Sequence, residues 1–524
     1  MGGSTVTTLA PCISVLGTAS DVGKSIVVTA LCRIFNDMGI SVAPFKAQNM
    51  SNNSFVVDGP GDDVGEIGRA QVAQAEAARI APHVDMNPVL LKPMTNVGSQ
   101  VVVRGRAIGQ SSAAEYGNRT KALRDISLEC LTRLRQQYDL VVMEGAGSCA
   151  EVNLRARDFV NFEMAKQSDA SVILVADIDR GGVFAQVLGT LDLLSDAERR
   201  LVTGVVINRF RGDATLFSDG IDFIEKKGRV KVLGMMPHIR NIGIDDEDAV
   251  VLDKGIQQLD DHSTERLTVG VIHLPHISNF TDFKPLERCG AVHLKYLEKG
   301  ADAEGCDILM LPGTKSVPGD LRWLRRQGFD ARILAHVKAG KPVLGICGGY
   351  QMLGRRISDP LGIEGTPGEI EGLGLLDVQT ELAQTKALSR RCGIWLDANV
   401  QVTGYEIHQG RTMRLDGAQA VVRMTDNGEL EGARSRDGLV IGTYLHGLLD
   451  SAAFLQMYLQ KVNSRITVDK ASFETDMQGE DAYDRLADIV RNHLDIPQIL
   501  ADAGMRMASP GKERFDVLRA ERGL

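Results

Sequence analysis

Short apolar runs alternate with longer amphipathic segments along most of the chain. The runs at 11–16, 139–144, 171–177 and 201–208 have the length of buried strands, and a helical spacing of apolar residues follows position 25. Strands that alternate with helices are typical of a parallel sheet covered by helices on both faces. We therefore predict an α/β fold with a doubly wound first domain.

The same alternation resumes in the second half of the chain after an interruption. Residues 245–265 are acidic and lack a clear core pattern, which indicates a boundary. A chain of 524 residues is also too long for one core. Beyond position 450 the spacing of apolar residues predicts amphipathic helices. We predict an α/β domain at 1–245, a linker at 246–266, a second α/β domain at 267–455 and a helical extension at 456–524.

Composition narrows the class of protein. With 44% hydrophobic and 24% charged residues the chain is ordinary for a globular protein, and its net charge of −9 disfavours nucleic acid as the main partner. No apolar run is long enough to cross a membrane, and the first residues do not have the pattern of a signal peptide. The eight cysteines are scattered, with no Cys-x-x-Cys pair, which favours a reducing cytoplasm. The oligomeric state stays open, a homo-oligomer included.

A glycine-rich loop at 17–25 follows the first predicted strand and precedes a helix. Its glycines allow backbone N–H groups to surround a phosphate, Lys24 can reach the β and γ oxygens of ATP, and the Ser25 hydroxyl can bind Mg²⁺. The loop is one residue longer than the common spacing and resembles dethiobiotin synthetase and its relatives, which activate carboxylates with ATP. The resemblance also places Asn208 near the adenine. The predicted ATP contacts are Gly17, Thr18, Val22, Gly23, Lys24, Ser25 and Asn208.

Carboxylates end two of the predicted strands. Glu144 follows one buried run, and Asp177 and Asp179 follow another. A hard cation that bridges phosphates prefers carboxylate oxygen. We expect only one of the two aspartates to face the nucleotide; helix capping is the alternative for either. We predict that Ser25, Glu144 and Asp179 hold the metal.

A second set of residues predicts a glutamine-hydrolysing site. The apolar run 343–346 is followed by Cys347, two glycines and a helical pattern, which is the arrangement of a nucleophile elbow. A lone cysteine after a strand is more often a core residue. Here, however, His446 ends a later strand and can act as base, while the backbone N–H groups of Gly313 and Gly348 can form an oxyanion hole. In this order the motifs resemble a class I glutamine amidotransferase.

Four further motifs, at 45–50, 66–71, 86–93 and 98–101, resemble the cobyric acid synthase family of cobalamin biosynthesis. The resemblance implies ATP- and glutamine-dependent amidation of the b, d, e and g carboxylates of adenosylcobyrinic acid a,c-diamide, through acyl phosphates and released ammonia. One alternative is cobyrinic acid a,c-diamide synthase, which performs the same chemistry on other carboxylates. Another is a ParA-like scaffold ATPase with an inert amidotransferase module.

Basic and amide side chains in these motifs are candidates for holding the corrinoid. Guanidinium and ammonium groups are the available partners for its carboxylates, although exposed basic residues often have no ligand. The candidates are Lys46, Gln48, Asn49, Arg69, Lys92, Arg104 and Arg180. The stretch 404–412 also matches the family, and we expect Tyr405 and Glu406 to line the glutamine pocket.

One position departs from the amidotransferase pattern. Many class I enzymes carry a glutamate two residues after the catalytic histidine, where this chain has Leu448. We therefore expect a Cys347–His446 dyad, steadied by a backbone carbonyl or by Glu406. Loss of an orienting group can cost orders of magnitude in rate. This predicts slow glutamine hydrolysis until the ATP-dependent domain is loaded.

Overall fold

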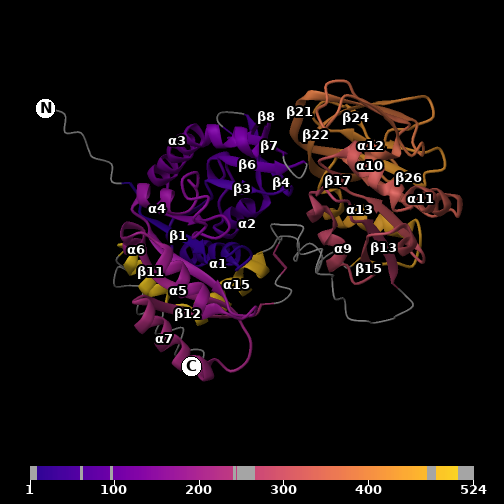
Figure 1. The fold of residues 1–524 in the computed structure, drawn as a ribbon. Helices are drawn as coiled ribbons and strands as arrows, with labels where there is room; N and C mark the ends of the chain where they lie inside the picture. Colours follow the sequence, from indigo (N-terminus) through magenta and orange to yellow (C-terminus); the bar gives the residue numbers. More distant parts are fainter. Residues whose placement is uncertain are drawn as a thin grey trace.

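The computed structural model describes residues 9–59, 63–94, 98–239, 243–244, 266–468 and 480–505. Two α/β units lie side by side, the first in indigo to magenta and the second in rose to orange (Figure 1). The predicted linker, except for residue 266, lies outside the described residues, as does the end of the chain after 505. Within the described ranges, no helix combines the length and apolar character that crossing a bilayer requires.

The first domain is built on a sheet of six parallel strands, so the predicted fold class is confirmed. β1 and β10 are buried along their whole length, which explains why they read as unbroken apolar runs. Helices cover both faces. The strand order is β12 (Lys231–Pro237), β11 (Val202–Phe210), β10 (Ser171–Asp177), β1 (Cys12–Gly17), β9 (Leu140–Glu144) and β2 (Val42–Phe45). The helices are α1 (Lys24–Asp37), α2 (Arg69–Ala77), α3 (Ala113–Gln137), α4 (Phe162–Ser168), α5 (Val183–Leu193), α6 (Asp196–Leu201) and α7 (Ser218–Gly228).

A smaller layer branches from the first domain after β2. The stretch 48–54 is dense in amide and hydroxyl side chains, yet residues 48–50 form a short strand that pairs with residues 89–91, and residue 54 begins a hairpin strand. One sheet contains β3 (Gln48–Met50), β6 (Val89–Pro93), β7 (Gly98–Val103) and β8 (Arg106–Ser112). A hairpin pairs β4 (Ser54–Asp58) with β5 (Val64–Gly68).

The second domain contains two six-stranded sheets. The central one is parallel apart from its last strand: β15 (Val292–Leu297), β13 (Leu267–Ile272), β16 (Ile308–Leu311), β18 (Val343–Ile346), β26 (Val440–Thr443) and β25 (Ala433–Arg434). The other comprises β20 (Gly368–Glu371), β19 (Arg356–Asp359), β21 (Val378–Trp395), β22 (Val400–Arg414), β23 (Val422–Met424) and β24 (Leu430–Glu431). A short pair joins β14 (Ile277–Ser278) to β17 (Gly313–Thr314). The helices include α9 (Lys284–Arg288), α10 (Val317–Arg326), α11 (Phe329–Lys338) and α12 (Gly348–Leu353).

The predicted C-terminal helices form, and they divide between the two domains. α13 (Ala452–Gln460) packs into the second core, where Phe454 meets Trp395 edge-on with ring centroids 4.6 Å apart. α15 (Glu480–His493) and α16 (Ile496–Asp502) return to the first domain and pack beside α1. Figure 1 shows α15 in yellow beside the indigo helix. The end of the described chain therefore completes the core of the domain with which the chain begins.

The β4–β5 hairpin forms much of the contact between the domains. Val56 of the hairpin is fully buried against Tyr405 and Ile407 of β22. Polar contacts flank this small apolar cluster: the Asn279 amide donates to the Ser54 carbonyl over 3.0 Å, and the Thr281 hydroxyl donates to Asn53 over 3.1 Å. Residues 279 and 281 lie shortly before α9, so the hairpin contacts the second domain close to the candidate site of that domain.

Candidate functional site

Cys347 lies at a sharp turn between β18 and α12, as the pattern of apolar and glycine residues predicts. Its backbone adopts φ 52° and ψ −108°, a conformation that a residue with a side chain rarely holds without support. The turn is tight because Gly349 packs on the preceding strand, where an added Cβ would lie 2.1 Å from the Leu311 carbonyl oxygen. The thiol is 7% exposed and lies 3.7 Å from the Ile407 carbonyl oxygen. Strained, supported turns of this kind are typical of nucleophiles.

A carboxylate that the sequence did not point to holds the histidine. His446 Nδ1 lies 2.7 Å from Asp282 Oδ2, and the Gly447 N–H donates to the other carboxylate oxygen over 2.9 Å. Both side chains are buried. The expectation of a dyad steadied by a backbone carbonyl or Glu406 is therefore wrong: the fold supplies an aspartate from a segment far upstream.

Glu406 has other partners. It pairs with Arg391 at 3.2 Å and lies 3.9 Å from His408 Nε2. Burial would raise the pKa of Glu406, but His408 and Arg391 outweigh it and lower that pKa. These contacts stabilise an anion on β22 and leave the orientation of His446 to Asp282.

The charge of His446 follows from its surroundings. Burial by itself would lower the pKa of the imidazole, but Asp282 and the Cys347 thiol together outweigh burial and raise that pKa to about 10. The imidazolium form is thus favoured at neutral pH, directly beside the sulfur. A positive neighbour of this kind favours the nucleophilic thiolate.

Tyr405 packs against the ring of His446. Its ring stacks on His446 with centroids 5.4 Å apart, and the two backbones exchange hydrogen bonds of 2.9 and 3.1 Å. The Tyr405 hydroxyl accepts from Asn279 and donates to the Ser54 carbonyl of the first domain. Tyr405 therefore links the position of the imidazole to the interface.

The two glycines predicted for the oxyanion hole are brought together. A Cβ on Gly348 would lie 3.0 Å from the backbone nitrogen of Thr314, and a Cβ on Gly313 would lie 3.4 Å from His446 Cε1. β17 therefore runs between the imidazole and the first turn of α12. The assignment of the backbone N–H groups of these glycines to an oxyanion hole stays a prediction.

The phosphate-type loop of the first domain is held in a tight conformation. Gly23 has φ 93°, and a Cβ there would lie 2.1 Å from Asn208 Nδ2. The Asn208 amide donates to the Val22 carbonyl over 2.8 Å, so it braces the loop from the end of β11. Lys24 Nζ donates to the Gly147 carbonyl over 2.9 Å, and the Thr18 hydroxyl donates to the Val175 carbonyl over 3.3 Å.

Glu144 lies at the centre of a polar cluster beneath this loop. Its Oε1 accepts from Ser25 over 2.9 Å and from Lys46 over 2.8 Å, and its Oε2 accepts from Gln74 over 2.5 Å. The Ser25 hydroxyl and the Glu144 carboxylate are adjacent oxygen groups of the kind Mg²⁺ prefers. These two residues therefore fit a magnesium ion.

Asp179, the third predicted metal ligand, has other contacts. Its carboxylate pairs with Arg211 at 2.5 Å, and its backbone N–H donates to Asp177, which in turn pairs with Arg209. The hydrogen bond from Arg211 lowers the pKa of Asp179. Among the described residues, no group of three or more His, Cys, Asp or Glu side chains forms a metal site. The structure thus brings Ser25 and Glu144 together without Asp179.

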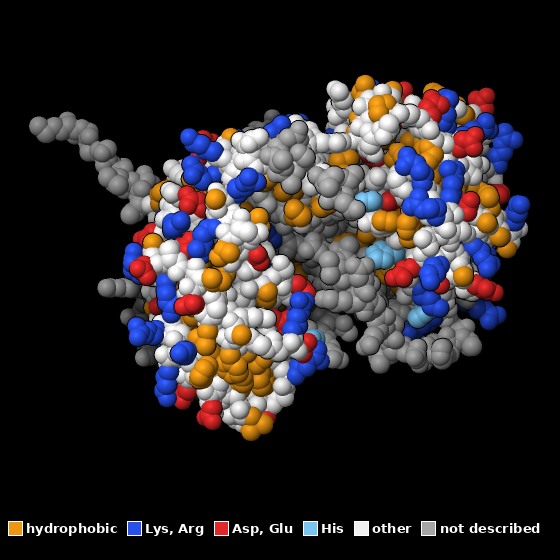
Figure 2. Space-filling model, viewed as in Figure 1, with side chains coloured by type: hydrophobic (Ala, Val, Ile, Leu, Met, Phe, Trp, Pro, Cys, Tyr) orange, Lys and Arg blue, Asp and Glu red, His pale blue; other side chains and the backbone are white. Residues whose placement is uncertain are grey.

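The predicted corrinoid-binding residues contact separate partners. Lys46 is bound to Glu144, and Lys92 is fully buried against Glu66. The others contact Tyr116 (Gln48), Gln71 (Asn49), Glu76 (Arg69), Asp85 (Arg104) and Asp21 (Arg180). On the face shown in Figure 2, basic and acidic side chains are interspersed over both lobes, without a single basic stripe.

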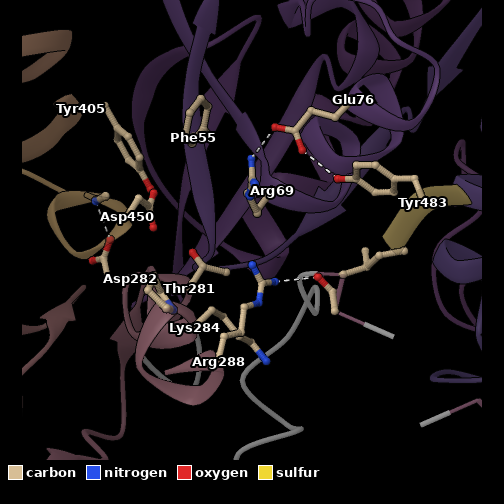
Figure 3. A pocket seen from close by; sticks show the side chains of 14 residues that line it. Phe55, Arg69, Glu76, Thr281, Asp282, Lys284, Arg288, Tyr405, Asp450 and Tyr483 are labelled. Carbon is tan, nitrogen blue, oxygen red and sulfur yellow. Dashed lines mark hydrogen bonds and ion pairs between the residues drawn. The ribbon is translucent and has the colours of Figure 1, made fainter. Parts of the chain in front are cut away.

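Arg69 differs from the other candidates because it lines a pocket between the domains. The cavity is about 130 Å³, and Lys284 and Arg288 of α9 also border it. Figure 3 shows Arg69 and Arg288 on one side of the pocket, with Lys284, Asp282 and Tyr405 on the other. The guanidinium of Arg69 lies over the Phe55 ring, 5.1 Å from its centroid. The pocket therefore combines positive charge with a wall that belongs to the glutaminase site.

Sequence reasoning missed Asp282, although a signal was present. The stretch 275–283 resembles the family and Asp282 is its only carboxylate, but nothing in its spacing linked that carboxylate to a histidine 164 positions away. Glu66 begins one of the family motifs, but no local pattern linked it to Lys386, which it meets at the domain interface.

Comparison with known proteins identifies the two domains. Residues 13–248 match the family described as "CobQ/CobB/MinD/ParA nucleotide binding domain", and residues 268–454 match the "CobB/CobQ-like glutamine amidotransferase domain". The chain is 48% identical to a cobyric acid synthase of Chlorobium chlorochromatii, over 93% of this chain and 96% of that protein. It is 48% identical to one of Chlorobaculum tepidum (94% and 98% covered) and 47% identical to one of Vibrio vulnificus (93% and 98% covered).

Proposed function

Because the chain belongs to the cobyric acid synthase family, we propose that it uses ATP and glutamine to amidate the b, d, e and g carboxylates of adenosylcobyrinic acid a,c-diamide. The observation that carries the proposal is the joining of two sites in one chain. The Cys347–His446–Asp282 arrangement can release ammonia, and the loop at 17–25 can bind a triphosphate. The alternative that the amidotransferase module is inert is disfavoured by this assembled site.

The glutaminase half-reaction begins at sulfur. The Cys347 thiolate attacks the side-chain carbonyl carbon of glutamine, and the backbone N–H groups of Gly313 and Gly348 stabilise the oxyanion. His446 gives a proton to the departing nitrogen, so NH₃ leaves and a glutamyl thioester remains. Water, deprotonated by His446, then releases glutamate. Asp282 keeps the imidazole oriented throughout, because its carboxylate accepts a hydrogen bond from the Nδ1–H group.

In the synthetase half-reaction, a corrinoid carboxylate oxygen attacks the γ-phosphorus of ATP. ADP leaves, and the resulting acyl phosphate is attacked by NH₃, which displaces phosphate and yields the amide. Lys24 and the loop N–H groups neutralise the phosphates. Mg²⁺, when bound, would be held by Ser25 and Glu144 and would supply positive charge to the phosphates. Each amidation consumes one ATP and one glutamine.

Arg69 is the residue we propose for a carboxylate of the corrinoid. It lies in the interdomain pocket with Lys284 and Arg288, where it pairs with the partly exposed Glu76, whereas Lys46 and Lys92 pair with buried glutamates. A guanidinium at the edge of a cavity suits carboxylate recognition. For Asn208, the bond to the loop supports a bracing role near the nucleotide.

Mass spectrometry of the corrinoid product tests the proposal. The enzyme with ATP and glutamine should add four nitrogens in place of four oxygens, and the alternative, cobyrinic acid a,c-diamide synthase, would modify other carboxylates. Cys347→Ala should lose glutamine-dependent amidation by at least about 10³-fold yet still use ammonium. Absence of any amidated corrinoid with either nitrogen source would overturn the proposal.

A further inference from the structure

A buried cluster of charged side chains lies where the two domains meet. Glu66 of β5 is 1% exposed, and its carboxylate accepts from Lys92 of β6 through one oxygen and from Lys386 of β21 through the other. The Ser54 hydroxyl donates to the same carboxylate over 2.7 Å. Burial would raise the pKa of Glu66, but Lys386, Lys92 and Lys315 hold it well below its usual range. Glu66 is therefore an anion with lysines from both domains around it.

The cluster contains three lysines and one glutamate, and burial lowers the pKa of Lys386 to about 8 and that of Lys92 well below its usual range. Two ammonium groups bind the single Glu66 carboxylate directly, and Lys315 lies near enough to act on Glu66, Lys92 and Lys386. Lys315 also acts on Glu364, which accepts from the Val317 N–H over 2.6 Å and whose pKa burial raises to about 7. A buried charge without a full counter-charge is costly. The arrangement is thus suited to receive one more carboxylate.

A bulge in β21 includes Lys386, which lies near enough to Cys347 for the two groups to interact electrostatically. Leu382 pairs with Gly410 and Ala387 pairs with His408, so five steps along β21 match only two along β22. Extra residues of this kind re-aim a side chain. Lys386 donates to the Gln100 side-chain oxygen over 3.4 Å, and the Gln100 amide donates to Gln409 over 3.1 Å.

This bulge lies next to the elbow. Ile407, two positions before Gln409 on β22, is the residue whose carbonyl oxygen lies 3.7 Å from Cys347 Sγ. Cys347 is near enough to act electrostatically on Lys386, and Lys315 directly follows the oxyanion strand β17. Lys386 and Lys315 therefore border the space that an amide substrate at Cys347 must occupy.

We propose that Lys386 binds the α-carboxylate of glutamine and that Glu66 of the first domain holds the Lys386 ammonium group in place. The inference rests on the proposed use of glutamine. It adds that substrate recognition in the amidotransferase domain depends on a side chain of the other domain. When the side-chain amide of glutamine lies at Cys347, its α-carboxylate reaches the lysine and supplies a negative charge. The glutamine site is therefore complete only when the two domains are in contact.

Hydrolysis of two amides by the full-length enzyme tests this role. Glutamine is compared with 4-aminobutyramide, which has the same amide and amino group but no α-carboxylate. In Lys386→Met we expect the kcat/KM of glutamine relative to that of 4-aminobutyramide to fall by roughly 100-fold, which is the range of a charged hydrogen bond. The loss should appear in the KM of glutamine rather than in kcat. Lys386→Arg should restore part of the preference for glutamine. Lys338→Met, at an exposed position of α11, should keep the wild-type preference.

Two results would overturn the proposal. An unchanged preference in Lys386→Met would remove the lysine from carboxylate recognition. A parallel loss for both amides would assign Lys386 to the interface alone. Failure of the proposed function would look different, because wild-type enzyme would then lack glutamine-dependent amidation altogether.

Discussion

The glutaminase site and the nucleotide site differ in the groups that their charged side chains contact. In the glutaminase site, Cys347, His446 and Asp282 contact one another, and each is buried. In the nucleotide site, Lys24 and Glu144 contact protein groups, namely a backbone carbonyl and Lys46. The first site is preorganised for attack on an amide, whereas phosphates and metal must compete for partners already engaged in the second.

This difference has a physical reason. A thiol needs a fixed imidazole at its side, because the pair acts through a short contact whose geometry sets the rate. A triphosphate brings several negative charges that enter and leave in every cycle, so the groups that receive it need alternative partners in its absence. Slow glutamine hydrolysis before ATP binds would then require control from outside the triad, since the triad is already assembled.

The largest expected effect comes from Asp282→Asn, which keeps the shape of the side chain and removes its charge. Glutamine-dependent kcat should fall by roughly 10³-fold, as when a triad aspartate is lost. Burial lowers the pKa of His446, but Asp282 and Cys347 together raise it to about 10. Without the carboxylate, the imidazolium deprotonates at lower pH, so the alkaline limb of the pH–rate profile should move to lower pH.

Glu406→Gln is the matched control for Asp282→Asn. It changes Glu406, the carboxylate that the sequence suggested for this role, and it should leave the alkaline limb in place. An equal shift of the limb in both variants would mean that Asp282 does not hold the imidazole. Ammonium-dependent amidation should stay unchanged in both.

Lys24→Met should produce the next largest effect, and in the opposite half of the enzyme. Removal of the ammonium from the loop should lower amidation by roughly 10²-fold with glutamine or ammonium as nitrogen source. Hydrolysis of glutamine alone should persist, since the triad lies in the other domain. Lys166→Met, on the surface of α4, serves as control. Retained amidation in Lys24→Met would contradict the assignment of the loop.

Asn208→Ala should have the smallest effect. It removes the 2.8 Å hydrogen bond to Val22 and leaves a buried carbonyl unsatisfied, at a cost of about 1–3 kcal/mol. The loosened loop should raise the KM for ATP by about tenfold, with little change in the kcat of glutamine hydrolysis. ATP titrations of amidation measure the first quantity, and an unchanged KM would show that Asn208 is not needed to shape the loop.

Local patterns determined much of this protein. The strand, glycine turn and helix around Cys347 are contiguous, as are those at 17–25, so hydrophobic spacing and glycine placement were enough to locate both. The alternation of strands and helices also determined the fold class. The amphipathic spacing after position 450 predicted α13 and α15, because one face of each must be buried.

Tertiary structure alone decided which distant groups meet. Asp282 reaches His446 because the short turn before α9 packs against the segment that follows β26, and Lys386 reaches Glu66 because a bulge in one domain faces a hairpin of the other. It also decided that α15 closes the first domain. Local periodicity carries no information on such pairs, since their meeting depends on how separately formed elements pack and on which buried charges need a partner.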